Sequence, residues 1–120
     1  VVQEFQIEFY EMSDGTEPAK DFISSLDTKM RAKVLHTVAL LGSSGPFLRE
    51  PYSKLLDDGI FEIRTKFGSD ITRVLYFFVV GKKVILTNGF IKKSQKTPRA
   101  EIELAKKYRA DYFSRKENSK

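Results

Sequence analysis

The middle of the chain carries three runs rich in β-branched and aromatic residues, at positions 60–67, 71–80 and 83–91. Runs of this composition are typical of β-strands. Two-residue segments, Gly68-Ser69 and Gly81-Lys82, separate them, and glycine at the first central position suits a type II′ turn. Because strands joined by such short turns pair in opposite directions, the pattern predicts a three-stranded antiparallel meander.

Before the meander, the pattern predicts one strand and two helices. Apolar and polar residues alternate loosely over residues 3–10, which indicates a first strand. Pro18 suits the first turn of a helix that runs to about residue 26. Asp27 or Thr28 caps a second helix, which Gly42 ends after about residue 41. The buried stripe of this second helix has helical spacing and consists of Met30, Val34, Val38 and Leu41.

Glycine, serine and proline predict a loop at residues 42–52, and residues 55–59 lead from it into the meander. Thr97-Pro98 opens a third helix to about residue 113, and the polar residues 114–120 are predicted to fray. The order β-α-α-β-β-β-α predicts an α+β fold with a mainly antiparallel four-stranded sheet and a helical hairpin on one face. Residues 1–120 are expected to form a single domain.

The two predicted turns also set the register of the meander. They place Arg64 opposite Arg73 and Phe90 opposite Arg73, so these three side chains share one face in a row across the sheet. The next rung holds Lys66, Ile71 and Lys92, and the preceding rung holds Glu62, Leu75 and Asn88. The other face carries the predicted core residues Phe61, Ile63, Val74, Tyr76, Phe78 and Ile85.

Two arginines directly opposite each other should repel. Such a local conflict is expected at a functional site. The alternative is a solvated sheet face on which the arginines form salt bridges with Glu62 or Asp70.

The composition limits the chemistry that the chain can perform. A net charge of +5 favours nucleic acid, an acidic protein or an anionic surface as partner. The absence of cysteine excludes disulfides, thiolate metal sites and a cysteine nucleophile, and the single histidine, His36, excludes a His-rich metal site. We expect no metal and no small-molecule cofactor. No run is long and apolar enough to cross a bilayer, so no membrane partner is expected, and the composition is compatible with the cytoplasm.

Residues 89–98, GFIKKSQKTP, combine an aromatic residue, a group of lysines and a helix start. Phe90 suits stacking against a base, and Lys92, Lys93 and Lys96 suit contacts with phosphate. This segment therefore predicts one edge of a site for a phosphate-rich ligand.

The runs DGIFEIRTK, TRVLYFF and ILTNGFIKKSQKTP, followed by an acidic and then basic helix, resemble the HigB-type branch of the RelE toxin superfamily. These are phage-derived host-inhibition toxins of bacterial type II toxin–antitoxin systems. The resemblance covers residues 50–113, and the preceding helices in order only. It implies a small cytoplasmic endoribonuclease, an mRNA interferase that cuts mRNA on the translating ribosome and so inhibits translation. It also implies a HigA-like helix-turn-helix antitoxin as partner.

The resemblance implies a role for each site residue. Arg64 matches a basic residue of the catalytic face, and Arg73 matches the arginine that contacts the scissile phosphate. Lys92 or Lys93 matches the basic position after the last strand. RNA contacts are expected from Lys66, Phe90, Asn88 and Lys96, with Asn88 standing where relatives often carry histidine.

Metal-independent RNA cleavage uses the neighbouring 2′-hydroxyl as nucleophile. Arginine forks are suited to hold the phosphate oxygens. The general base stays open between Glu62 and a lysine held among other cations. The alternative function is a non-catalytic module of the same fold that binds RNA or a partner protein.

Overall fold

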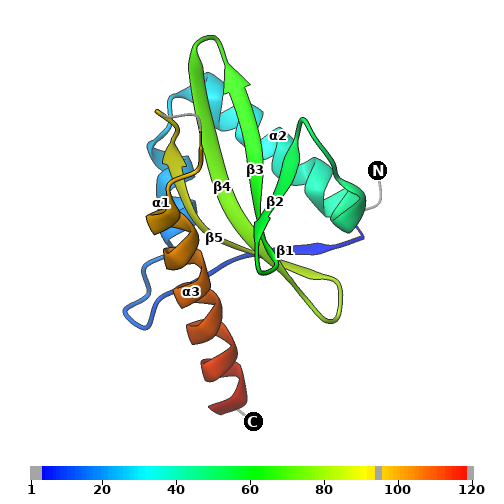
Figure 1. Cartoon of the computed structure of the whole chain (residues 1–120), viewed down its shortest axis with the longest axis vertical. Coiled ribbons are helices and arrows are strands. Elements are labelled where there is room, and N and C mark those ends of the chain that lie inside the picture. Colours follow the sequence, from blue (N-terminus) through cyan, green and yellow to red (C-terminus); the bar gives the residue numbers. More distant parts are fainter. Residues whose placement is uncertain (1–3, 94–95, 119–120) are drawn as a thin grey trace.

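A computed structural model describes residues 4–93 and 96–118. Five strands form one sheet in the order β1-β5-β4-β3-β2, in which β1 is parallel to β5 and the other neighbours are antiparallel (Figure 1). In chain order the elements are β1 (Gln6–Phe9), α1 (Pro18–Ser25), α2 (Thr28–Ser44), the short 3-10 helix η1 (Gly45–Phe47), β2 (Ser53–Asp57), β3 (Ile60–Phe67), β4 (Asp70–Val79), β5 (Lys83–Ile91) and α3 (Arg99–Asn118).

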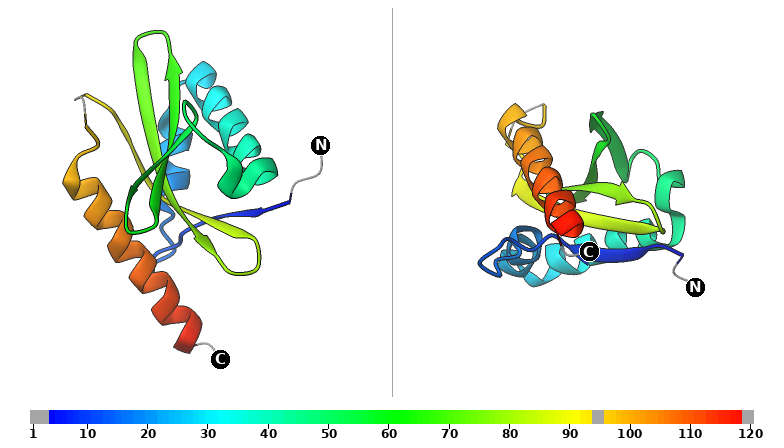
Figure 2. Two further views of the ribbon diagram at one scale, coloured as in Figure 1. Left: turned by 45° about the vertical axis from the view of Figure 1, so that its right-hand side comes forward. Right: turned by 90° about the horizontal axis from the view of Figure 1, so that it is seen from below.

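Helices cover both faces of the sheet (Figure 2). The α1–α2 pair packs on one face, and its predicted stripe of Met30, Val34, Val38 and Leu41 is buried there. Helix α3 packs on the other face, where Ile102 and Ala105 join a second apolar cluster. Apolar burial on both faces gives the central strands little contact with water, so a polar side chain on them needs a partner.

The predicted α+β class is confirmed, but the four-stranded sheet is wrong. The fifth strand is β2, which pairs with β3 through a turn at Asp58-Gly59. Both turn residues have positive φ, 50° and 77°, which fits a type I′ hairpin. The adjacent Leu55 and Leu56 break the apolar–polar alternation that would have indicated a strand, and the register shifts between Leu55 and Asp57.

Two predicted element ends are also wrong. Helix α2 continues past Gly42, which is buried inside it, and ends at Ser44, with Gly45 as its C-cap at a φ of 54°. Helix α3 continues through residues 114–118, which were predicted to fray. Strand β1 has four residues, and the predicted strand start at Gln3 lies outside the described residues. The predicted capping of α2 by Asp27 is confirmed, since its carboxylate accepts a hydrogen bond from the Met30 amide.

The register of the first hairpin is as predicted. The loop of the second hairpin is one residue longer than predicted. Val79 pairs with Lys83, so the loop has three residues and not two. A β-bulge at Thr87 then inserts one extra residue into β5, and beyond it Phe90 lies opposite Arg73 as predicted. The shift also moves Ile85 to the face covered by α3, which corrects its predicted place in the other core.

Gly89 allows α1 to pack closely on β5. A Cβ atom at this position would collide with the ring of Phe22 on α1. We expect Gly89→Ala to lower the free energy of unfolding by about 1–3 kcal/mol, the usual cost of overpacking, as measured by urea denaturation. The same change in a Phe22→Leu background should cost less, because the smaller side chain leaves room. Equal costs in both backgrounds would show that this contact is not the reason for the glycine.

Candidate functional site

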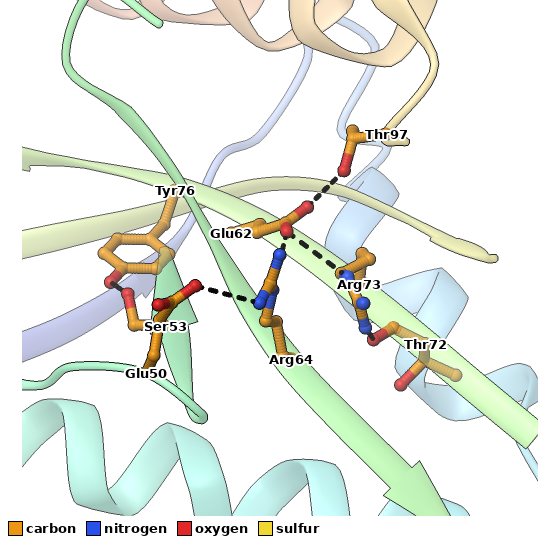
Figure 3. Close-up of polar contacts among 8 residues, drawn as sticks. All are labelled: Glu50, Ser53, Glu62, Arg64, Thr72, Arg73, Tyr76 and Thr97. Atoms are coloured by element: carbon orange, nitrogen blue, oxygen red, sulfur yellow. Dashed lines mark hydrogen bonds and ion pairs between the residues drawn. The ribbon is translucent and has the colours of Figure 1, made fainter. Parts of the chain in front are cut away.

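One buried carboxylate organises the polar residues on the α3 side of the sheet. Glu62 on β3 is only 1% exposed. Its Oε2 lies 2.9 Å from Arg64 Nε and 3.3 Å from Arg73 Nε. Its Oε1 accepts a hydrogen bond from the hydroxyl of Thr97, two residues before the start of α3 (Figure 3). The carboxylate therefore separates the two arginines and joins β3, β4 and the start of α3.

The predicted row of Arg64, Arg73 and Phe90 is present in the register of the sheet. Arg73 is the innermost of the three, with a side chain only 9% exposed. Its Nη1 donates a hydrogen bond to the Thr72 carbonyl at 3.0 Å, whereas its Nε lacks a well-aligned hydrogen-bond partner. Burial lowers the pKa of Arg73 from its usual value, the Arg64 charge adds to this, and Glu62 opposes it. The guanidinium nevertheless stays charged, because the ordinary arginine pKa is so high.

Arg64 is the more accessible arginine. Its side chain is 25% exposed and bridges two carboxylates, since Nε contacts Glu62 and Nη1 lies 3.2 Å from Glu50 Oε1. The Glu50 partner is itself exposed, so this outer ion pair is screened by water and weak. Arg64 can therefore exchange Glu50 for another anion while Glu62 keeps its Nε in place.

A groove of about 250 Å³ opens above this cluster. We define the cationic groove by its four basic lining residues, Lys54, Arg64, Lys92 and Lys96, which surround Glu62 and Thr97. Lys54 comes from β2, where it lies opposite Glu62. Sequence reasoning missed Lys54 because it missed β2, although the hairpin signal at Asp58-Gly59 would have placed it on this face.

Lys92 and Lys93 differ in position. Lys92 follows β5, is partly buried and lines the groove. Lys93 is exposed and does not line it. Lys66 lies toward the end of β3, is also exposed and lies outside the groove, whereas Lys96 lines it. Of the predicted basic residues, the groove thus contains Arg64, Lys92 and Lys96.

The surroundings of Lys92 favour loss of its proton. Burial is the main cause that lowers the pKa of its ammonium below the usual value. The charge of Arg73 lowers it further, followed by those of Arg64 and Lys54, while Glu62 acts in the opposite direction. A lysine of this kind is suited to proton transfer closer to neutral pH than an ordinary lysine.

Asn88 and Phe90 are directed to α3 and not to the groove. The Asn88 amide nitrogen donates hydrogen bonds to the carbonyl and the carboxylate of Glu101, at 3.2 and 3.0 Å. Phe90 is partly buried and packs against the α3-side apolar cluster. Neither lines the groove, so the structure gives both residues a role in holding α3 on the sheet.

The other titratable candidates lie elsewhere. His36 is exposed on α2, across the sheet from the groove. Tyr112 on α3 packs edge-to-face on Phe77 and against the α3-side apolar cluster.

Comparison with known proteins gives one family. A family model described as phage derived protein Gp49-like (DUF891) matches residues 21–110, which span the helical pair, the meander, the cationic groove and the first half of α3. A search of curated proteins found no match to the chain. No helix within residues 4–93 and 96–118 has the length and apolar character needed to span a membrane.

Removal of the buried carboxylate should test its organising role. We expect Glu62→Gln to lower the free energy of unfolding by about 3–5 kcal/mol, because it leaves the charge of Arg73 buried without a counter-charge. Glu50→Gln is the matched control, since it removes the other carboxylate of Arg64 at an exposed position and should cost less than about 1 kcal/mol. Chemical denaturation of both variants measures the difference. Similar costs for the two changes would contradict the role assigned to Glu62.

Proposed function

Because the chain belongs to the family of phage-derived Gp49-like proteins, we propose that it is the toxin of a type II toxin–antitoxin system. In this proposal the protein is a HigB-type endoribonuclease that cleaves mRNA on the translating ribosome in the cytoplasm. A HigA-like helix-turn-helix antitoxin holds it inactive. The antitoxin and the ribosome rest on the sequence resemblance, whereas the cleavage chemistry also draws support from the groove.

The observation that carries this proposal is the convergence of Lys54, Arg64, Lys92 and Lys96 on one groove. Four cations around a small concave surface create a strong positive potential, which attracts the phosphates of a nucleic acid. Arg64 offers a planar fork of donors that matches two phosphate oxygens. Since its outer partner Glu50 is exposed, a phosphate can replace that carboxylate at little cost.

The cleavage step requires the 2′-hydroxyl to lose its proton and attack the adjacent phosphorus. The bond to the 5′-oxygen breaks and that oxygen takes up a proton, which leaves a 2′,3′-cyclic phosphate and a 5′-hydroxyl. We assign the proton transfer to Lys92, whose pKa is lowered by burial and by neighbouring cations. Glu62 is less suited to act as a base, because one of its oxygens contacts two arginines and the other accepts the Thr97 hydroxyl. Arg64 and Lys54 stabilise the charge that develops on the phosphate.

Arg73 has an indirect role in this proposal. With 9% of its side chain exposed, it contributes positive charge from beneath the groove and lowers the pKa of Lys92. The sequence resemblance instead places its counterpart on the scissile phosphate.

Two observations favour a second candidate function. Arg73 is enclosed, and Asn88, where relatives often carry histidine, is bound to Glu101 on α3. A groove that keeps its cations but lacks a proton-transfer group would bind RNA without cleaving it. The second candidate is therefore a non-catalytic RNA-binding module of the same fold.

Three variants test the proposed function. Arg64→Ala should weaken RNA binding and abolish growth inhibition in cells. Lys92→Arg keeps the positive charge but cannot take up a proton, so it should bind RNA normally and cleave at least about 100-fold more slowly. Lys29→Ala, an exposed change on the far side of the sheet, should behave like the unaltered protein. Primer extension on mRNA from a translating extract measures cleavage, and filter binding measures affinity.

The pH dependence gives a further criterion for Lys92. The cleavage rate should rise with pH, because the deprotonated form of Lys92 is the active base. It should level off at a pH below 10.5, the usual lysine pKa, because the pKa of Lys92 is lowered. Unchanged cleavage by Lys92→Arg would contradict the assignment of Lys92. Salt-sensitive RNA binding without any cleavage, even on ribosomes, would favour the non-catalytic module.

A further inference from the structure

A second cavity adjoins the cationic groove at the edge of β3. Its volume is about 390 Å³, and we call it the edge cavity. Its walls include Lys33 from α2, Tyr52 before β2, Arg64 and Lys66 from β3, and Ile71 and Arg73 from β4. This volume falls within the range of roughly 300–1,000 Å³ that small-ligand pockets occupy. Arg64 lines both the groove and the edge cavity, so the two are neighbours.

Tyr52 is an aromatic side chain in this wall that the proposed cleavage does not use. Tyr52 is 46% exposed, so a ligand can reach its side chain. Its backbone is fixed on both sides, because its amide donates to the Arg49 carbonyl and its carbonyl accepts from the Arg64 amide at 2.8 Å. A ring on an anchored backbone loses little freedom when a ligand binds against it.

The register of the sheet relates Tyr52 to the arginine row. Ser53 pairs with Ile63, and Lys54 pairs with Glu62, so the position opposite Arg64 is that of Tyr52. The row of Arg64, Arg73 and Phe90 therefore continues to a fourth residue on the β2 side. Phe90 at one end packs under α3, whereas Tyr52 at the other end is exposed.

The charge of the edge cavity selects the kind of ligand. Four cations line it, Lys33, Lys66 and the two arginines, and no carboxylate lines it among the described residues. Lys33 is held at the rim, since its Nζ donates to the Lys66 carbonyl at 2.6 Å and lies 5.7 Å from the centre of the Phe67 ring. An exposed aromatic ring among cations is the combination that single-stranded nucleic acid binds, through base stacking and phosphate contacts.

We infer that Tyr52 is a stacking platform for a base of single-stranded RNA, and that the edge cavity holds the nucleotide next to the one bound in the cationic groove. This inference rests on the proposed function for its RNA ligand. The chain of the RNA passes across Arg64, which contacts the phosphate between the two nucleotides. Lys33 and Lys66 neutralise the phosphate that follows. Tyr52 is thus a positioning residue, and it takes no part in proton transfer.

Binding of a short single-stranded RNA at several salt concentrations separates stacking from charge. Tyr52→Ala should weaken binding about 5- to 150-fold, the range that corresponds to loss of one base–aromatic stack. The slope of log affinity against log salt should not change, because the tyrosine carries no charge. Arg64→Ala should reduce that slope by about 0.7, the value for one phosphate contact in a single strand. Tyr52→Phe should bind like the unaltered protein.

Two lysines on one helix provide a matched pair for the cavity. Lys33 lines the edge cavity, and Lys29 lies one turn earlier on α2 and does not line it. Lys33→Ala should reduce the salt slope, and Lys29→Ala should leave it unchanged. Thermal unfolding of each variant verifies that the fold is retained.

The outcomes distinguish this inference from the proposed function. If Tyr52→Ala binds RNA normally while Arg64→Ala binds weakly, stacking on Tyr52 is overturned and the function stands. If Tyr52→Phe is as weak as Tyr52→Ala, the hydroxyl and not the ring makes the contact, and stacking is again overturned. If Tyr52→Ala loses a protein partner but keeps RNA, the cavity is a protein-binding site. If neither Arg64→Ala nor Tyr52→Ala alters RNA binding, the proposed function fails as well.

Discussion

The buried carboxylate of Glu62 is the constraint on which the polar side of this sheet depends. Two arginines face each other on neighbouring strands, an arrangement that is unfavourable unless an opposite charge lies between them. Glu62 supplies that charge to both. Its second oxygen holds Thr97 and so places the start of α3 over β3. Glu62 thus stabilises the arginine pair and fixes the start of α3 next to it. Its side chain also lines the cationic groove.

This arrangement divides the positive charges into two groups. Arg73 lies inside, balanced by Glu62, and acts on the cationic groove through its electric field, because it does not line that groove. Lys54, Arg64, Lys92 and Lys96 line the surface above it, where a ligand can reach them. Because it is buried, the inner charge is little screened by water, and it offsets the negative charge of Glu62 beneath the outer group. An enclosed cation therefore influences the groove without lining it.

Much of the sheet follows from local sequence. The bounds of β3 and β5 and the Gly68-Ser69 turn were predictable, because alternation and turn chemistry depend on neighbouring residues only. Strand β2 was missed because its two adjacent leucines do not alternate. The bulge at Thr87 was missed because it depends on tertiary packing. Residues of β5 pack into apolar clusters on both faces of the sheet, and the pattern of a single strand does not show this. The Arg64–Arg73 register was predicted, but the burial of Arg73 was not, since it depends on where α3 packs.

The bulge at Thr87 separates the geometry of β5 into two independent halves. The three-residue hairpin loop at residues 80–82 sets the register between β4 and the first half of β5. The extra residue at Thr87 shifts that register by one from Asn88 onward. The tip of the hairpin is open, with Val80 99% exposed. A peptide tag or fluorophore inserted at this tip would consequently leave the Arg73–Phe90 pairing in place, and it would provide a handle on the molecule at the end of the sheet remote from the groove.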